Sequence, residues 1–249
     1  MKAVLLAGGL GERLRPLTND KPKVMLPIGR KPVLEHNLIL LKKANILDII
    51  ITLYYKRDAI IDYFKDGRGL GVNIAYAHQE NLLGSAGDVK RINTDFKSSF
   101  VVIYGDNFSN CDLKSALEYH RQDKQMATIV FFDRERNPNS QIIGGCLRLE
   151  PKTNRILEFI EGEDCLTNYV NAGIYILEPE ILNYIPLNTF YDFGKDLFPK
   201  LLKEGKVLSG YLMPQNEYLF GIDTVDCYEK TNRFYKDKLS EDISYGDLY

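Results

Sequence analysis

A cluster of basic side chains lies beside a glycine-rich turn near the start of the chain. The glycines are Gly8, Gly9 and Gly11, and the basic residues that follow are Arg13, Arg15, Lys21 and Lys23. Backbone N–H groups of such a turn can cradle phosphate oxygens, an arginine can hold a phosphate through two parallel hydrogen bonds, and a lysine adds a point charge. Residues 6–23 therefore predict a binding site for a small polyphosphate.

Two well-known phosphate-binding loops do not fit this segment. A P-loop would close with Gly-Lys-Ser or Gly-Lys-Thr, which is missing here. In a dinucleotide-binding loop, the run from Gly9 would need a third glycine where Leu14 stands, and an acidic residue would follow the second strand. Both requirements fail, so the sequence disfavours an NAD-binding enzyme.

The loop must be positioned by a strand, and residues 3–7 form a compact apolar run that stops at Gly8. Bounded runs of this kind are typical of strands buried on both faces of a parallel sheet. Further strands are predicted at residues 49–54, 73–77 and 100–104, with helices between them at residues 34–44, 58–64 and 87–93. This alternation predicts an α/β fold with a Rossmann-like, mostly parallel mixed sheet flanked by helices.

Polar, glycine-rich segments follow the predicted strand ends at residues 8–13, 79–87 and 105–107. Ligands of open α/β sheets bind beyond the carboxyl ends of the strands, so these segments are expected to meet at one rim. The second half is more mixed. Its predicted strands are residues 127–132, 145–149, 156–160 and 173–177, and its predicted helices are residues 193–202 and 227–239. Without a linker or repeat, a single domain over residues 1–249 is favoured.

The opening segment resembles the signature loop of the sugar-1-phosphate nucleotidyltransferases, also called pyrophosphorylases. The family pattern is Leu-Ala-Gly-Gly-x-Gly-x-Arg-Leu-x-Pro-Leu-Thr, and residues 6–18 follow it, with Pro22-Lys23 and Lys31-Pro32 downstream. The likeness extends through Asp223. It implies a glycosyltransferase-A-like nucleotidyltransferase fold with a nucleotide-binding half (1–110), a sugar-phosphate-binding half (111–225) and a C-terminal helical tail (226–249).

The resemblance implies that a nucleoside triphosphate and a sugar 1-phosphate react to give a nucleotide-sugar and pyrophosphate, a step of nucleotide-sugar and polysaccharide biosynthesis. It assigns the nucleotide to residues of the loop and of the segment after the third strand. These are Leu6, Ala7, Gly8, Gly9, Gly11, Arg13, Lys23, Gln79, Gly84 and Ser85. Arg13, Lys23 and Asp106 are the expected catalytic residues. Gln79 suits a base edge but equally fits a solvated loop.

Two aspartates match the metal positions of the family. Asp106 lies in Tyr-Gly-Asp-Asn at a strand end, and Asp223 lies in Phe-Gly-Ile-Asp-Thr, where phenylalanine replaces the family tryptophan. Two carboxylates at one site suit Mg²⁺, which prefers one or two carboxylates plus phosphate oxygens. Mg²⁺ is therefore the expected cofactor. For Asp223, a role as the N-cap of the following helix is an open alternative.

The sugar-phosphate site is implied by weaker matches and contains one departure. The matching residues are Gly145, Glu161, Asn171 and, as a substitute cation, Lys195. The family lysine that contacts the sugar phosphate is replaced by Gly162, which removes a positive charge. Either Lys195 supplies that charge or the acceptor is held differently. The loss also leaves open a non-catalytic relative that senses or regulates nucleotide-sugars.

The base is not determined by these motifs. The Leu-Gly-Ser-Ala-Gly stretch and the length look most like mannose- or heptose-1-phosphate guanylyltransferases, so GTP is favoured, with CTP, dTTP and UTP as alternatives. Composition restricts the other partners. A net charge of −2 argues against nucleic acid, and no apolar run is long enough to span a membrane. A homo-oligomer is possible, through packing of the tail.

The four cysteines, at positions 111, 146, 165 and 227, have neither zinc-site spacing nor a disulfide framework. Free cysteines in a reducing environment are expected, which predicts a cytoplasmic protein.

Overall fold

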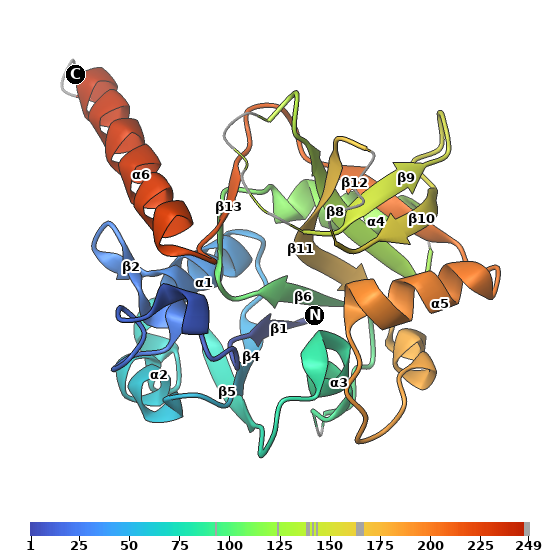
Figure 1. Ribbon diagram of the computed structural model, residues 1–249, viewed down its shortest axis with the longest axis horizontal. Helices are drawn as coiled ribbons and strands as arrows, with labels where there is room; N and C mark the ends of the chain where they lie inside the picture. The colour runs from blue at the N-terminus through green and yellow to red at the C-terminus, as the bar shows by residue number, and fades with distance from the viewer. Residues whose placement is uncertain are drawn as a thin grey trace.

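The computed structural model describes residues 1–92, 94–123, 125–137, 140, 142, 144–162 and 167–246, with the side chains of the last helix described as far as residue 238. Their centre is a nine-stranded mixed sheet in the order β10-β9-β11-β6-β1-β4-β5, in which β8 pairs with β11 and β12 pairs with β8 (Figure 1). The strands are β1 (Lys2–Leu6), β4 (Asp48–Leu53), β5 (Asn73–His78), β6 (Phe100–Tyr104), β8 (Ala127–Asp133), β9 (Cys146–Leu149), β10 (Ile156–Ile160), β11 (Tyr169–Leu177) and β12 (Leu208–Leu212).

The first half of the sheet is parallel. β1 pairs with β4 and β6, and β4 pairs with β5, all in the same direction. β11 then runs antiparallel to β6 and carries the sheet into the second half of the chain. Because β1, β4, β5 and β6 end at the same edge, the polar segments that follow them meet there, as the sequence predicts. The predicted fold class is confirmed.

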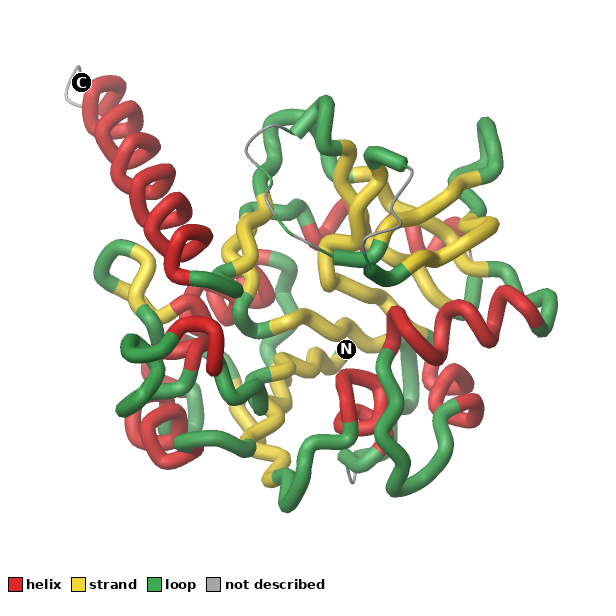
Figure 2. The backbone as a smooth tube through the Cα atoms, in the orientation of Figure 1, coloured by secondary structure: helices red, strands yellow, loops and turns green. Residues whose placement is uncertain are grey.

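Helices cover both faces of the sheet (Figure 2). They are α1 (Val33–Lys43), α2 (Arg57–Phe64), α3 (Gly84–Lys90), α4 (Leu113–Asp123), α5 (Phe198–Lys203) and α6 (Val225–Gly246), with short helical turns η1 (Glu12–Leu14), η2 (Lys23–Met25), η3 (Arg68–Leu70), η4 (Pro179–Tyr184) and η5 (Phe193–Leu197). One buried core joins the sheet to α1, α2 and α4 through side chains such as Leu38, Ile60 and Ala116. The other joins it to α3, η5 and α5 through Val89, Phe193 and Phe198. The sheet is therefore buried on both faces, which explains its apolar strands.

Two small antiparallel pairs lie outside the main sheet. β2 (Pro27–Ile28) pairs with β3 (Lys31–Pro32), and β7 (Asn107–Ser109) pairs with β13 (Leu219–Gly221). In the second pair Asn107 lies opposite Gly221. This short ladder matters for the site, because it places the residue before β7 beside the residues that follow β13.

Several elements differ from the sequence prediction. The helix expected at residues 87–93 begins at Gly84, and Asn93 lies outside the described residues. It begins early because the carbonyl oxygen of Tyr191 accepts the N–H groups of Ala86 and Gly87, at 3.0 and 2.9 Å. The expected helix 193–202 is a π-helical turn followed by α5. The sequence did not predict β7, α4, β12 or β13, of which β7 and β13 are only three residues long.

The expectation of free cysteines is confirmed for Cys111 and Cys227 and is wrong for Cys146, which is disulfide-bonded. Cys165 lies outside the described residues. Wide spacing along the chain misled the prediction, because cysteine pairing depends on distance in the fold. No helix among the described residues is long and apolar enough to cross a membrane.

Candidate active site

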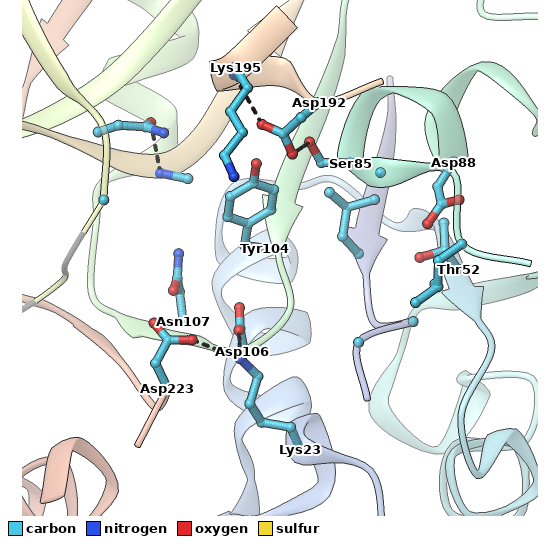
Figure 3. A pocket seen from close by; sticks show the side chains of 18 of the residues that line it. Lys23, Thr52, Ser85, Asp88, Tyr104, Asp106, Asn107, Asp192, Lys195 and Asp223 are labelled. Carbon is cyan, nitrogen blue, oxygen red and sulfur yellow. Dashed lines mark hydrogen bonds and ion pairs between the residues drawn. The ribbon is translucent and has the colours of Figure 1, made fainter. Parts of the chain in front are cut away.

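A cavity of about 450 Å³ opens at the carboxyl ends of β1 and β6. Figure 3 shows it from close by, with side chains from both halves of the chain around it. The sequence-predicted residues that line it are Leu6, Gly8, Gly9, Arg13, Lys23, Gly84, Ser85, Asp106, Gly145, Glu161, Asn171, Lys195 and Asp223. Ala7, Gly11 and Gln79 are not part of its lining. Most of the predicted site thus converges on one cavity.

Lys23 is the centre of an ion-pair cluster on one side of the cavity. Its ammonium contacts the carboxylate of Asp106 and lies 2.9 Å from Oδ1 of Asp223. Arg13 reaches the same Oδ1 atom at 3.1 Å. Burial by itself would lower the pKa of Lys23, but the two carboxylates outweigh burial and raise that pKa above its ordinary value. Lys23 therefore stays charged over the whole range in which proteins work.

The fold explains how residues so far apart in sequence meet in this cluster. Asp106 lies between β6 and β7, and the N–H of Ile222 donates to its carbonyl oxygen at 3.4 Å. Asp223 follows directly, so the β7–β13 ladder sets the two carboxylates side by side. The N-cap alternative for Asp223 is wrong. The hydroxyl of Thr224 accepts the N–H of Cys227 at 3.2 Å, so Thr224 is the N-cap of α6.

The donor set of this cluster suits a hard cation. Asp106 and Asp223 both touch one ammonium group, so their oxygens converge on a single point. Among the described residues, no group of three or more His, Cys, Asp or Glu side chains is arranged to hold a metal. A site with two carboxylates that leaves its other positions to phosphate oxygens and water is the arrangement that Mg²⁺ favours.

Ala7 and Gly11 shape the glycine-rich loop rather than line the cavity. The N–H of Ala7 donates to the hydroxyl of Thr52 at 3.1 Å, which ties the loop to the end of β4. Gly11 has a left-handed backbone, with φ of 65°, and its carbonyl oxygen accepts the hydroxyl of Thr18 at 2.8 Å. Glycine is favoured there because other residues rarely adopt that φ. The turn leaves Gly8 and Gly9 facing the cavity.

Gln79 is buried and does not line the cavity, whereas Asp88, further along the same segment, does. The amide nitrogen of Gln79 donates to the carbonyl oxygen of Asp88 at 3.4 Å. The carboxylate of Asp88 lines the cavity beside Thr52, and its Oδ1 atom accepts the N–H of Leu83 at 2.9 Å (Figure 3). Burial raises the pKa of Asp88, and the bond from Leu83 opposes that shift only in part.

Glu161 and Lys195 mark the other side of the cavity, which we call the acceptor end and define by Glu161, Asn171 and the segment 190–195. Glu161 fits against Gly145 and Gly194, where any side chain would collide with its carboxylate. Burial first, and then the nearby charge of Asp192, raises the pKa of Glu161, while Lys195 lowers it. Asn171 donates to the hydroxyl of Tyr175 at 2.8 Å and accepts the N–H of Gly173 at 3.0 Å. Its amide is thus largely held by the fold.

Because Gly162 stands where the family has a lysine, the acceptor end has one basic side chain among the described cavity residues. The basic residues among the described cavity lining are Arg13, Lys23 and Lys195, and only Lys195 lies at the acceptor end. Its side chain extends toward Tyr104, between the two ends of the cavity (Figure 3). Gly162 itself has a φ of 108°, a backbone conformation in which a lysine would be strained.

Five polar residues that line the cavity are not among the predicted site residues: Thr52, Asp88, Tyr104, Asn107 and Asp192. Two of them, Asp88 and Asp192, have sequence features that could have indicated a role in the site. Asp88 is an acidic residue beside apolar residues in a predicted helix, and Asp192 directly precedes the predicted helix 193–202, at the N-cap position that aspartate favours. The sequence predicts Tyr104 as a strand residue from its neighbours, and nothing in the sequence indicates that it lines the cavity.

A family model described as nucleotidyl transferase matches residues 2–238. Among curated proteins, this chain is 39% identical over 220 residues to a UTP–glucose-1-phosphate uridylyltransferase of Synechocystis sp., covering 82% of this chain and 56% of that protein. It is 33% identical over 205 residues to a mannose-1-phosphate guanylyltransferase of Mycobacterium tuberculosis, with the same two coverages. The chain therefore spans little more than half the length of these relatives.

Solved structures have the same fold. A putative glucose-1-phosphate thymidylyltransferase from Bacillus anthracis superposes with a TM-score of 0.80 at 23% identity, covering 95% of this chain and 96% of that one. HddC from Yersinia pseudotuberculosis, complexed with GMP-PN, superposes with a TM-score of 0.75 at 26% identity, covering 94% and 99%. Both cover almost the whole of the present chain.

Proposed function

This chain belongs to the nucleotidyl transferase family, and from that premise we propose that it joins a nucleoside triphosphate to a sugar 1-phosphate, releasing pyrophosphate. The observation that supports this most is the cluster of Arg13, Lys23, Asp106 and Asp223 beside the glycine-rich loop in one cavity. The relatives named above carry sugar-1-phosphate nucleotidyltransferase names. The product would be an activated sugar of the kind consumed in polysaccharide synthesis.

In the proposed reaction, a phosphate oxygen of the sugar phosphate attacks the α-phosphorus of the triphosphate. The new P–O bond forms as the bond to the β-phosphate oxygen breaks, and that electron pair leaves with pyrophosphate. The attacking phosphate is already largely ionised near pH 7, since its second pKa is about 6. No general base is needed, so the work of the site is to place two anions together and to neutralise charge.

Lys23 and Arg13 are proposed to supply that positive charge. Gly8 and Gly9 would receive the triphosphate oxygens, Lys23 would lie near the α-phosphate, and Arg13 would grip the phosphates that leave. Asp106 and Asp223 would hold Mg²⁺, which when bound neutralises phosphate charge and polarises the phosphorus. Both carboxylates pair with Lys23, so its ammonium group occupies the point where the metal ion would be held. Lys23 would therefore contact the triphosphate only after the metal ion displaces its ammonium group from the two carboxylates.

Lys195 is proposed to bind the acceptor phosphate in place of the family lysine, which is Gly162 in this chain. It is the basic residue at the acceptor end among the described cavity residues, and its side chain extends toward the middle of the cavity. Glu161 would accept hydroxyl groups of the sugar, and the glycines at positions 145 and 194 leave room for its carboxylate at the cavity wall.

GTP is the proposed nucleotide. The Mycobacterium tuberculosis relative is named a guanylyltransferase, and the structure of HddC holds GMP-PN. Asp88 adds a chemical argument. A carboxylate only accepts hydrogen bonds, and guanine presents two adjacent donors, N1–H and the 2-amino group. Uracil and thymine present one N–H between two carbonyl oxygens, which a carboxylate repels. UTP is the second candidate, favoured by the 39% identity to a uridylyltransferase.

The test is a panel of GTP, UTP, dTTP and CTP against mannose 1-phosphate and glucose 1-phosphate with Mg²⁺. Pyrophosphate release and the mass of the nucleotide-sugar are measured together. We expect one triphosphate to dominate, with GTP first. If nucleotides raise the melting temperature but no combination of triphosphate and sugar phosphate yields pyrophosphate, the chain is a non-catalytic, nucleotide-binding relative. The loss of the family lysine at Gly162 favours that alternative.

A further inference from the structure

The segment that carries Lys195 is attached to the first turn of α3. The N–H of Tyr191 donates to the carbonyl oxygen of Leu83 at 2.7 Å, and the carbonyl oxygen of Tyr191 accepts two N–H groups of the helix. The first turn of α3 is part of the predicted nucleotide site. The nucleotide side of the cavity and the acceptor end are therefore joined by backbone hydrogen bonds.

Ser85 and Asp192 extend this connection through their side chains. The hydroxyl of Ser85 donates to Oδ2 of Asp192 at 2.6 Å and accepts the N–H of Phe193 at 2.9 Å. The other carboxylate oxygen, Oδ1, accepts the N–H groups of Gly194 at 2.9 Å and Lys195 at 3.3 Å. An unbroken series of hydrogen bonds thus runs from Ser85 to the backbone of Lys195, as Figure 3 shows in part.

Glycines keep the two segments close enough for these bonds. A Cβ atom at Gly84 would lie 2.6 Å from the carbonyl oxygen of Tyr191, and one at Gly87 would lie 2.8 Å from that of Thr189. Neither distance is tolerated between real atoms, so any side chain at these positions would separate the segments. The Gly-Ser-Ala-Gly sequence at the start of α3 is therefore suited to holding the acceptor segment.

We propose that Ser85 and Asp192 are positioning residues for Lys195, so that the turn beside the nucleotide fixes the cation that receives the acceptor phosphate. The inference rests on the proposed function and deepens it. It assigns the hydroxyl of Ser85 to the acceptor segment rather than to the nucleotide. It matters more in this chain because Gly162 leaves Lys195 without a second described cation at that end.

The test compares Ser85→Ala with Ser85→Thr. Loss of the hydroxyl leaves one oxygen of Asp192 and the N–H of Phe193 without the partner they have in the wild type. A hydrogen bond to a charged group contributes enough free energy to change an affinity about tenfold. We expect Ser85→Ala to raise both the Kd of mannose 1-phosphate or glucose 1-phosphate, by calorimetry, and its KM by about tenfold. The kcat and the KM for the triphosphate should change less than about threefold. Ser85→Thr keeps the hydroxyl and should restore binding.

The chain contains a matched control. Ser115 donates to Oδ2 of Asp112 at 2.6 Å, and Oδ1 of Asp112 accepts the N–H groups of Lys114 and Ser115, at the start of α4 and away from the cavity lining. Ser115→Ala removes the same kind of bond. It should cost similar stability and leave acceptor binding unchanged. An equal rise in acceptor Kd in both variants would reduce the effect of Ser85 to general destabilisation and overturn the proposal.

Amide hydrogen exchange tests the link without substrates. In Ser85→Ala, the amides of residues 193–195 should exchange faster than in the wild type, whereas Ser115→Ala should leave them unchanged. Unchanged exchange in Ser85→Ala, or faster exchange with unchanged acceptor Kd, would overturn the proposal. If the wild type binds sugar phosphates but never turns over, the proposed reaction fails while the link from Ser85 to Lys195 is still judged by binding and exchange. A wild type that binds no sugar phosphate would overturn both.

Discussion

The two sides of the cavity hold their charged side chains in different ways. Around Lys23, side chains from distant segments pair with one another: Arg13 and Lys23 with Asp223, and Lys23 with Asp106. At the acceptor end, Asp192 is bonded to a serine and to backbone N–H groups, and the side chain of Lys195 is exposed. In the first arrangement the charged side chains neutralise one another, and we infer that a ligand must displace one of these partners. The second arrangement fixes the backbone of Lys195 and leaves its ammonium group exposed in the cavity.

The largest effect is expected at Lys23. Lys23→Ala removes the charge proposed to face the α-phosphate, and loss of one such electrostatic contact lowers kcat by roughly 100-fold to 1,000-fold. Pyrophosphate release measures it, and circular dichroism checks that the variant is folded. Lys21→Ala, an exposed lysine of the same segment, should retain wild-type turnover. A Lys23→Ala variant that is folded and fully active would remove Lys23 from the mechanism.

A smaller effect is expected at the acceptor end. Lys195→Ala should raise the KM for the sugar 1-phosphate by roughly 10-fold to 50-fold, because a charged contact to phosphate is lost. The KM for the triphosphate should stay nearly constant. Lys203→Ala, an exposed lysine in α5, is the control and should change neither. If Lys195→Ala affected only the triphosphate, the division of the cavity into two ends would be wrong.

A substitution at Asp88 tests which base the site recognises, and the preference for GTP over UTP is expected to change about tenfold. Asp88→Asn can still accept the N–H of Leu83 but offers donors where the carboxylate only accepts. The ratio of kcat/KM for GTP over UTP should fall about tenfold. ITP, which lacks the 2-amino group, should be a poorer substrate than GTP for the wild type and nearly equal for the variant. An unchanged ratio, or a wild type that prefers UTP, would exclude Asp88 as the base-reading residue.

The smallest effect concerns stability. Burial raises the pKa of Glu161 above its ordinary value of 4.5, so the folded protein holds this proton more tightly than the unfolded chain. Between those two pKa values, stability contributed by Glu161 falls as pH rises. Glu161→Gln should therefore melt roughly 1–3 °C higher than the wild type at pH 7, with the difference vanishing below pH 4. Thermal unfolding at several pH values measures it. A variant that is less stable at pH 7 would show that the charged form is stabilised.

The cationic side was the part most accessible from sequence. Residues 6–23 form one continuous segment, and its glycines, Arg13 and Lys23 all reach the cavity except for Gly11, which shapes the turn. The alternation of strands and helices likewise predicted the parallel sheet. The meeting of Asp106 with Asp223 needed the resemblance, because the β7–β13 ladder that brings them together was not predicted.

The acceptor end depended on contacts that a sequence does not display. Ser85 was assigned to the nucleotide, whereas its hydroxyl bonds to Asp192 and the N–H of Phe193. The residue type of Ser85 was informative, but its partners came from a segment whose position only the tertiary structure determines. The role of Gln79 toward the base stays a prediction; the structure shows that this residue is buried and that its amide nitrogen donates to the carbonyl oxygen of Asp88.

The central claim is tested most directly by following the α-phosphorus. The wild-type protein is incubated with GTP labelled at that phosphorus, Mg²⁺ and mannose 1-phosphate or glucose 1-phosphate, and the products are separated. The account predicts that the label appears in a nucleotide-sugar while the pyrophosphate is unlabelled. If GTP, and then UTP, dTTP and CTP labelled in the same way, remained intact or gave only labelled monophosphate with every acceptor, the account would be contradicted.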